Sequence, residues 1–276
     1  MIATYKDSAT EEMEQDVACE EDVEGQVIQS FLENLENPEN LYTNVLQALD
    51  NCSDESIDTV LYELKHHQII ERLFGYLQGN NQFLDPFIHI LKEVSARSSV
   101  DIFADQNLIQ FLLSFISPEN ENLNLMSNIA IILRNYANFD PESASLVTQH
   151  GALNLFIQAF PPNIFDNELF ENQKDFLIES LSFFNDMLNI PKFYPEREFP
   201  AILTIAFSYI QSKNFDVCFQ SLDLLIAASS DKNYAHFEPF ILQNLPKYDL
   251  VLALTNSEDE EISNLALQFL INSTYS

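Results

Sequence analysis

The side chains that could carry chemistry in this chain are few and widely separated. His66 and His67 are adjacent, and neighbouring residues on a helix point about 100° apart, so this pair cannot chelate one ion from one face. The other three histidines, His89, His150 and His236, have no Cys-His or Asp-x-His grouping nearby. The sequence therefore predicts no metal site.

The sequence also gives no support for a calcium site, a catalytic nucleophile or cysteine chemistry. The acidic run at 258–261 lacks the Asp-x-Asp-x-Asp-Gly loop of a calcium site, and its carboxylates suit the positive end of a helix. Neither a glycine-rich phosphate loop nor a Gly-x-Ser-x-Gly nucleophile elbow occurs. We expect no enzyme activity, no cofactor and reduced thiols at the three separated cysteines, Cys19, Cys52 and Cys218.

Charge is the strongest compositional signal. The 276 residues include 12 Lys and Arg against 43 Asp and Glu, which gives a formal net charge of −31. Nucleic acids and anionic membranes are polyanions that bind through Lys and Arg, so both are disfavoured as partners. A basic peptide or protein is the expected partner. The absence of a signal-peptide pattern and of an apolar run of about 18 residues favours a cytoplasmic or nuclear location.

The chain divides at about residue 25 by its hydrophobic pattern. Residues 1–25 are acidic with no apolar period, which predicts a disordered tail. From Val27 onward, apolar residues recur at helical spacing as far as Phe269 and Leu270. With only four glycines and no Asn-Gly or Asp-Gly dipeptide between alternating strands, the pattern predicts an all-α domain over 26–276.

Within that domain, pairs of apolar helical segments repeat. Ile70, Ile109, Leu153 and Leu203 occupy equivalent positions at intervals of about 40–50 residues, which is typical of helical repeats. Five units, each expected to begin with a short first helix, and a partial sixth near 26–50 predict a right-handed α-solenoid of about five to six three-helix repeats. The paired segments are 69–77 with 87–94, 108–116 with 129–137, 152–160 with 176–188, 202–210 with 219–228, and 245–254 with 262–271.

The segment 124–160 resembles an armadillo repeat, most closely those of importin-alpha. The resemblance rests on Ile-Ala-Ile-Ile-Leu-Arg-Asn-Tyr-Ala at 129–137, followed by Ser-Leu-Val-Thr-Gln-His-Gly-Ala-Leu at 145–153 and Leu-Phe-Ile at 155–157. In the family a glycine lets the chain turn between the first and second helices; Gly151 fits this position, and Asn107 is its expected substitute one unit earlier. The resemblance implies an armadillo-like solenoid.

The resemblance also implies a peptide-binding groove. In importin-alpha, a ladder of Trp and Asn on the inner helices binds a basic nuclear localisation peptide. The Trp position becomes His89, Ile131, Ser182 and Leu222 here, and the Asn position becomes Glu93, Asn135, Asp186 and Ile226, so that only Asn135 matches. The family's basic amino-terminal segment corresponds to the acidic tail. The implied peptide-binding residues are Asn135, Glu93, Ile131, His89 and Asp186, in an acidic concave groove of a nuclear transport adaptor.

An alternative is a nucleotide exchange factor for a seventy-kilodalton heat-shock chaperone, since another armadillo-like group of similar length acts in this way. A nucleotide-release assay with the chaperone separates the two hypotheses. For the fold itself, the i, i+3, i+7 spacing predicts that Ala130, Leu133 and Ala137 are buried. Ile131 and Asn135, at i and i+4, are expected to share the exposed face.

Overall fold

The computed structural model describes seven stretches of the chain: residues 37–52, 57–77, 81–97, 106–161, 167–230, 232–243 and 245–274. Every regular element in these stretches is a helix. The chain forms two compact units, Met1–Ile102 and Phe103–Ser276, and each is described by itself. The predicted acidic tail at 1–25 lies outside the described residues and stays a prediction.

The described residues of the first unit include four α-helices that pack around an aliphatic and aromatic core. Its helices are α2 (Pro38–Asn51), α3 (Ile57–His66), α4 (Ile69–Leu77), the 3-10 helix η1 (Asn81–Phe83) and α5 (Leu84–Arg97). Tyr42 of α2 lies in this core, where its ring stacks on Phe83 with a centroid separation of 4.9 Å and its hydroxyl donates to the Leu73 carbonyl at 2.7 Å. Burial raises the pKa of Tyr42, so the hydroxyl keeps the proton that it donates.

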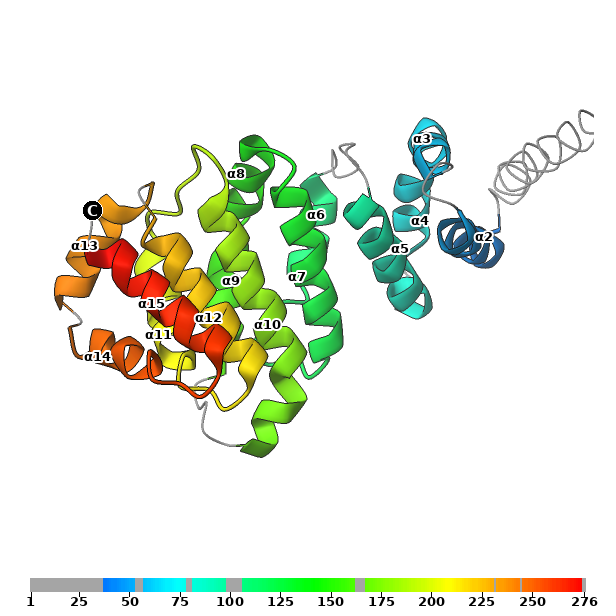
Figure 1. The fold of residues 1–276 in the computed structure, drawn as a ribbon. Coiled ribbons are helices and arrows are strands. Elements are labelled where there is room, and N and C mark those ends of the chain that lie inside the picture. Colours follow the sequence, from blue (N-terminus) through cyan, green and yellow to red (C-terminus); the bar gives the residue numbers. More distant parts are fainter. Residues whose placement is uncertain are drawn as a thin grey trace, which may run out of the picture. The chain divides into compact units, whose positions relative to one another are not determined.

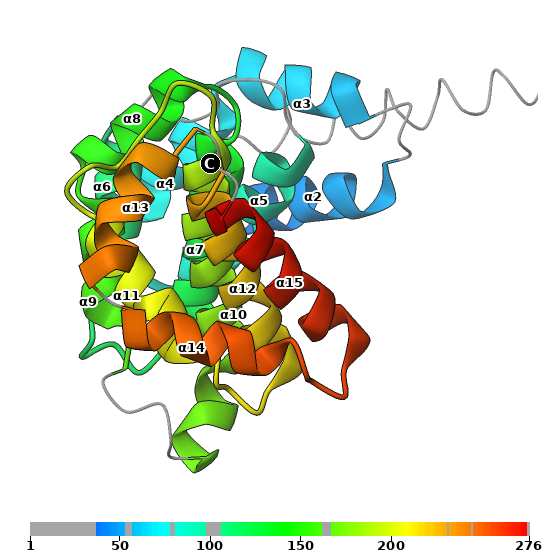
Figure 2. The same cartoon turned by 60° about the vertical axis from the view of Figure 1, so that its left-hand side comes forward.

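The second unit contains ten α-helices among its described residues, and four of them form one layer. Helix α7 packs on α10, α10 on α12, and α12 on α15, so these helices lie side by side (Figures 1 and 2). We call them the inner helices. The ten are α6 (Gln106–Leu113), α7 (Leu123–Ala137), α8 (Pro141–Gln149), α9 (Ala152–Ala159), α10 (Asn167–Asn189), α11 (Phe199–Tyr209), α12 (Phe215–Ala228), α13 (Tyr234–Gln243), α14 (Leu245–Leu254) and α15 (Glu260–Thr274).

The observed helices match the predicted repeat pairs. Helices α4 and α5, α6 and α7, α9 and α10, α11 and α12, and α14 and α15 fall on the five pairs of apolar segments. The prediction of a short first helix in every unit is wrong at 190–198, where the chain between α10 and α11 forms turns and no helix. Pro191 and Pro195 explain this difference, because proline disfavours helical backbone in the residue before it.

The buried stripe predicted on α7 is confirmed. Ala130, Leu133 and Ala137 are 0%, 0% and 1% exposed, and Ile129 and Ile132 are also fully buried. A helix that is apolar around most of its circumference belongs between other helices. The position of α7 beside α10 therefore follows from its sequence.

Polar residues begin the inner helices. Asn122 accepts from the Leu125 amide at 3.1 Å to cap α7, and Asn214 accepts from the Val217 amide at 3.2 Å to cap α12. Asp259 accepts from the amides of Glu261 and Ile262 at the start of α15. Asparagines thus cap two of the inner helices, and the prediction that the acidic run at 258–261 suits the start of a helix is confirmed.

The turn between first and second helices uses left-handed backbone. Gly151 has φ 83°, as predicted, and Gln68 has φ 52° at the equivalent position before α4. The prediction for Asn107 is wrong, because Asn107 lies within the first turn of α6. Glycine adopts the left-handed conformation without the steric cost that a Cβ atom causes.

Replacing Leu133 with Ala is expected to lower the free energy of unfolding by about 2–5 kcal/mol, because it leaves a cavity among fully buried neighbours. Chemical denaturation of the variant and the wild type measures this difference. A loss below about 0.5 kcal/mol, typical of surface positions, would contradict the placement of Leu133.

Replacing Gly151 with Ala is expected to lower the free energy of unfolding by about 1–2 kcal/mol through backbone strain alone. A Cβ atom at this position would meet no heavy atom within 4 Å, so steric overlap contributes nothing. Gly75, inside helix α4 and equally open, is the control. There the same substitution is expected to stabilise by about 0.5–1 kcal/mol. If both substitutions changed the free energy of unfolding in the same direction, the left-handed turn at Gly151 would be refuted.

Candidate functional site

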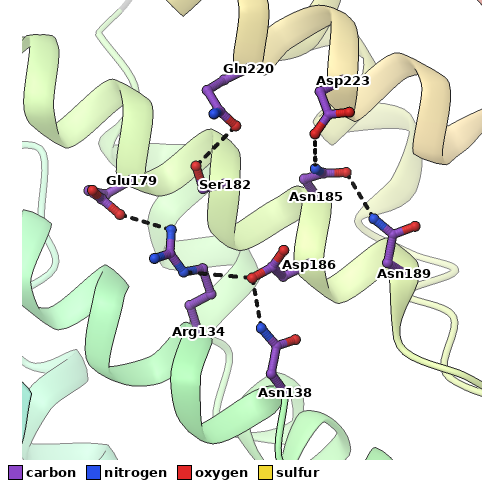
Figure 3. A network of polar contacts seen from close by, with 9 residues as sticks. All are labelled: Arg134, Asn138, Glu179, Ser182, Asn185, Asp186, Asn189, Gln220 and Asp223. Carbon is purple, nitrogen blue, oxygen red and sulfur yellow. Dashed lines mark hydrogen bonds and ion pairs between the residues drawn. The ribbon is translucent and has the colours of Figure 1, made fainter. Parts of the chain in front are cut away.

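A row of polar side chains crosses three of the inner helices (Figure 3). Its members lie on the part of each helix that the buried apolar residues do not occupy, and they contact one another between neighbouring helices. We call this set the polar row. It consists of Arg134 and Asn138 of α7, Glu179, Ser182, Asn185, Asp186 and Asn189 of α10, and Gln220 and Asp223 of α12.

Between α7 and α10, an arginine lies between two carboxylates. Arg134 Nη1 is 2.9 Å from Glu179 Oε2, and Arg134 Nε is 3.6 Å from Asp186 Oδ2. Asn138 Nδ2 donates to the same Asp186 oxygen at 2.7 Å. The three charged side chains are 24–34% exposed, so solvent screens them less than fully exposed pairs. The guanidinium thus donates a hydrogen bond to Glu179 and forms a longer ion pair with Asp186.

Between α10 and α12, the contacts are made by neutral groups and one carboxylate. Asn185 Nδ2 donates to Asp223 Oδ2 at 2.5 Å, and Ser182 Oγ donates to Gln220 Oε1 at 3.1 Å. Among the described residues, no cation forms an ion pair with Asp223. Elsewhere between these two helices, Lys174 Nζ forms an ion pair with Asp216 Oδ2 at 2.9 Å.

The environment of Asp223 disfavours its charged form. Burial raises the pKa of the Asp223 carboxyl, the hydrogen bond from Asn185 opposes this shift, and the negative charge of Asp186 adds to it. Asn185 is itself only 8% exposed and also accepts from Asn189 Nδ2 at 3.2 Å. Asp223 is therefore a half-buried carboxylate that is held in place by an amide and lacks a countercharge.

A hollow lies at one end of the polar row. Its volume is about 480 Å³, and its lining includes Asn138, Asp186 and Asn189 of the row together with Pro191 and Lys192 of the 190–198 turn segment. Lysine 232 fixes this segment by donating to the carbonyl of Leu188 at 2.9 Å and to that of Ile190. The hollow thus has a preformed wall next to a carboxylate of the row.

Two of the predicted peptide-binding residues flank the polar row and one belongs to it. Asp186 is a member, and Ile131 and Asn135 are half-buried on α7 beside Arg134. The alignment that placed Leu222 on the exposed face is wrong, because Leu222 is fully buried and the next residue, Asp223, is the one in the row. That Ile131, Asn135 and Asp186 bind a peptide stays a prediction.

The other two predicted residues, His89 and Glu93, lie on α5 in the first unit. Glu93 pairs with Arg97 at 2.9 Å, and His89 Nε2 is 3.9 Å from the other oxygen of Glu93. Arg97 Nη1 also donates to the Leu49 carbonyl at 2.6 Å, which ties this cluster to the end of α2. The expectation that His89 and Glu93 share a surface with Asn135 stays a prediction.

The sequence analysis missed Arg134, Asn185 and Asp223. Each is a polar residue in an apolar helix, and Arg134 is part of the segment that resembles an armadillo repeat. A search for polar residues at three- and four-residue spacing on α10, such as 182, 185, 186 and 189, would have found the α10 partner in the contacts with Gln220, Asp223 and Asn138.

The polar row can form hydrogen bonds and ion pairs. Among the described residues, no group of three or more His, Cys, Asp and Glu side chains is arranged to hold a metal ion. None of the described helices is long and apolar enough to cross a bilayer.

Solved structures similar to this chain include designed armadillo repeat proteins. One was solved in complex with the peptide (KR)4; it is 11% identical, has a TM-score of 0.67, and the match covers 90% of this chain and 98% of that chain. A second, computationally designed for modular peptide recognition, is 12% identical with a TM-score of 0.65 and covers 90% and 98%. An engineered protein matches with 12% identity, a TM-score of 0.65, and 91% and 96% coverage.

These similarities show the fold. The chain is an all-α protein with armadillo-like solenoid repeats, as predicted. No protein-family model and no curated protein matches the sequence. The structural neighbours support armadillo-like repeats in general and do not single out importin-alpha.

Replacing Asp223 with Asn is expected to stabilise the protein at pH 7 relative to the wild type. The folded-state pKa of Asp223 is raised, so the wild type loses stability as pH rises from the unfolded value of 3.8 through the folded value. The asparagine keeps an acceptor for Asn185 and cannot ionise. Urea denaturation at pH 4 and pH 7 measures the difference, which should be larger at pH 7. A variant that becomes less stable, relative to the wild type, as pH rises would contradict the raised pKa.

Proposed function

We propose that this protein is a non-enzymatic binding scaffold whose inner-helix face in the second unit binds an extended basic peptide or protein segment. The observation that carries the proposal is the polar row, which joins successive inner helices and contains more carboxylates than cations. The row contains the carboxylates of Glu179, Asp186 and Asp223 against the one cation of Arg134.

Each kind of side chain in the row has a use in peptide binding. An extended peptide has unpaired backbone amides and carbonyls, and asparagine side chains can donate to and accept from such groups. Asn138 and Asn189 lie on neighbouring helices beside Asp186, so an amide and a carboxylate can contact the same peptide. The similar designed protein in complex with (KR)4 supports a basic sequence as the ligand.

The charge of the whole chain favours the same class of partner. A net charge of −31 attracts a basic segment and speeds its encounter with the surface. Exposed charges are screened beyond roughly 8 Å at physiological ionic strength, so salt should weaken binding strongly.

We extend the proposal to nuclear transport, in which the bound segment is the localisation signal of a cargo and the protein acts in the cytoplasm and nucleus. The support is the resemblance of residues 124–160 to importin-alpha repeats. Accumulation of a fluorescent cargo with a basic signal in the nuclei of permeabilised cells, with and without this protein, tests the role. If the protein binds the cargo in solution but does not change its nuclear accumulation, the peptide-binding proposal stands and the role in nuclear import is wrong.

For binding itself, the peptide (KR)4 is expected to bind the wild type and to bind Asp223→Asn about five- to ten-fold more weakly, because a charge-assisted contact is lost. Isothermal titration calorimetry at two salt concentrations measures both affinities. Asp249→Asn, which removes the same charge from an exposed position on α14, is the matched control. An acidic peptide that binds as well as (KR)4 would refute the proposed partner class.

A further inference from the structure

The chain places one of its own cations on the face that is proposed to bind basic peptides. Arg134 of α7 reaches across to α10, where it contacts Glu179 at 2.9 Å and Asp186 at 3.6 Å. Asn138 takes the remaining contact shown for Asp186. We call the contact between two successive inner helices a step of the polar row. Both carboxylates that α10 contributes to the α7–α10 step are therefore already paired with a positive charge (Figure 3).

The next step along the row differs in this respect. Asp223 of α12 contacts the neutral amide of Asn185, and no cation pairs with it among the residues that the structure describes. A cationic side chain and a carboxylate attract each other more strongly when they are partly withdrawn from water. Asp223 is half-buried and meets this condition. An incoming basic side chain thus meets carboxylates that are already paired with a cation on the α7–α10 step, and a carboxylate without a paired cation on the α10–α12 step.

We propose that Arg134 is a specificity-determining residue that occupies, on the α7–α10 step, the position of a basic peptide side chain. A bound basic peptide then places a cation at Asp223 on the α10–α12 step and none on Glu179 and Asp186, which stay paired with Arg134. This inference rests on the proposed peptide-binding function and adds the register of the peptide to it.

The hollow beside Asp186 provides the space for this exchange. It holds about 480 Å³, and its lining combines polar and charged residues with apolar ones: Asn138, Asp140, Asp186, Asn189 and Lys192 with Phe139, Pro141, Ile190 and Pro191. With Arg134 present, Asp186 is already paired with a cation. Without Arg134, a lysine or arginine side chain that enters the hollow would meet the Asp186 carboxylate beside the neutral amide of Asn138.

The test compares the affinity of (KR)4 for the wild type and for Arg134→Gln by calorimetry. The variant is expected to bind about five-fold more tightly and with a steeper salt dependence, because one further ion pair becomes available to the peptide. Arg134→Lys, which keeps the charge, should bind like the wild type. Arg72→Gln, at an exposed arginine of α4, makes the same change in net charge and should leave the affinity unchanged.

The outcomes separate this inference from the proposed function. If neither the wild type nor Arg134→Gln binds (KR)4, the proposed function is wrong and the inference with it. If the wild type binds and Arg134→Gln binds equally or more weakly, the function stands and the role of Arg134 is overturned.

A measurement on the wild type keeps the inference testable if the variants do not fold. In a crystal structure of the complex with (KR)4, a peptide cation is expected at Asp223 while Arg134 still contacts Glu179 and Asp186. A peptide cation on Glu179 and Asp186, with Arg134 displaced, would overturn the inference.

Discussion

The packing of α10 between α7 and α12 is the interaction on which the second unit depends. Helix α10 buries Phe176, Leu177, Phe183 and Phe184 to 1% exposure or less, and Phe183 meets Phe156 of α9 at a ring-centroid separation of 5.2 Å. Fully burying a side chain of this kind contributes about 1.5–3 kcal/mol. A helix with neighbours on both sides must be apolar around most of its surface, which leaves only a narrow strip where polar residues can lie without a large desolvation cost.

That constraint explains why the polar row exists and why its contacts have the spacing that they have. The hydrogen bonds and ion pairs between inner helices join residues that are 38 to 52 positions apart, which is close to the interval between successive repeats. Strips on neighbouring helices come into contact because the repeats stack in register. Asn185 and Asp223 therefore meet as a consequence of the same apolar packing that buries Leu133 and Phe184. The candidate site is a product of the repeat and not of one local motif.

The sequence predicts those features that depend on local patterns. Helical periodicity located the repeat pairs, the three-, four- and seven-residue spacing placed Ala130, Leu133 and Ala137 in the core, and Gly151 marked a left-handed turn. Features that depend on contacts across repeats were missed. The partners of Arg134 are 45 and 52 residues away, and a shift of one residue in the alignment is enough to exchange buried Leu222 for Asp223. Left-handed Gln68 was missed because side-chain type gives no signal there, whereas the prolines at 191 and 195 could have revealed the missing first helix.

The two steps of the polar row also differ in what they contribute to folding. On the α7–α10 step, the desolvation of Glu179 and Asp186 is offset by Arg134, so this step is electrostatically complete in the free protein. On the α10–α12 step, the raised pKa of Asp223 means that its ionised form costs folding free energy at neutral pH. A cationic ligand that pairs with Asp223 removes this cost, so its binding and the stability of the fold are linked. The step that is least favourable for the free chain is therefore the one that gains most from a basic partner, which is the property that a binding surface needs and a purely structural contact does not.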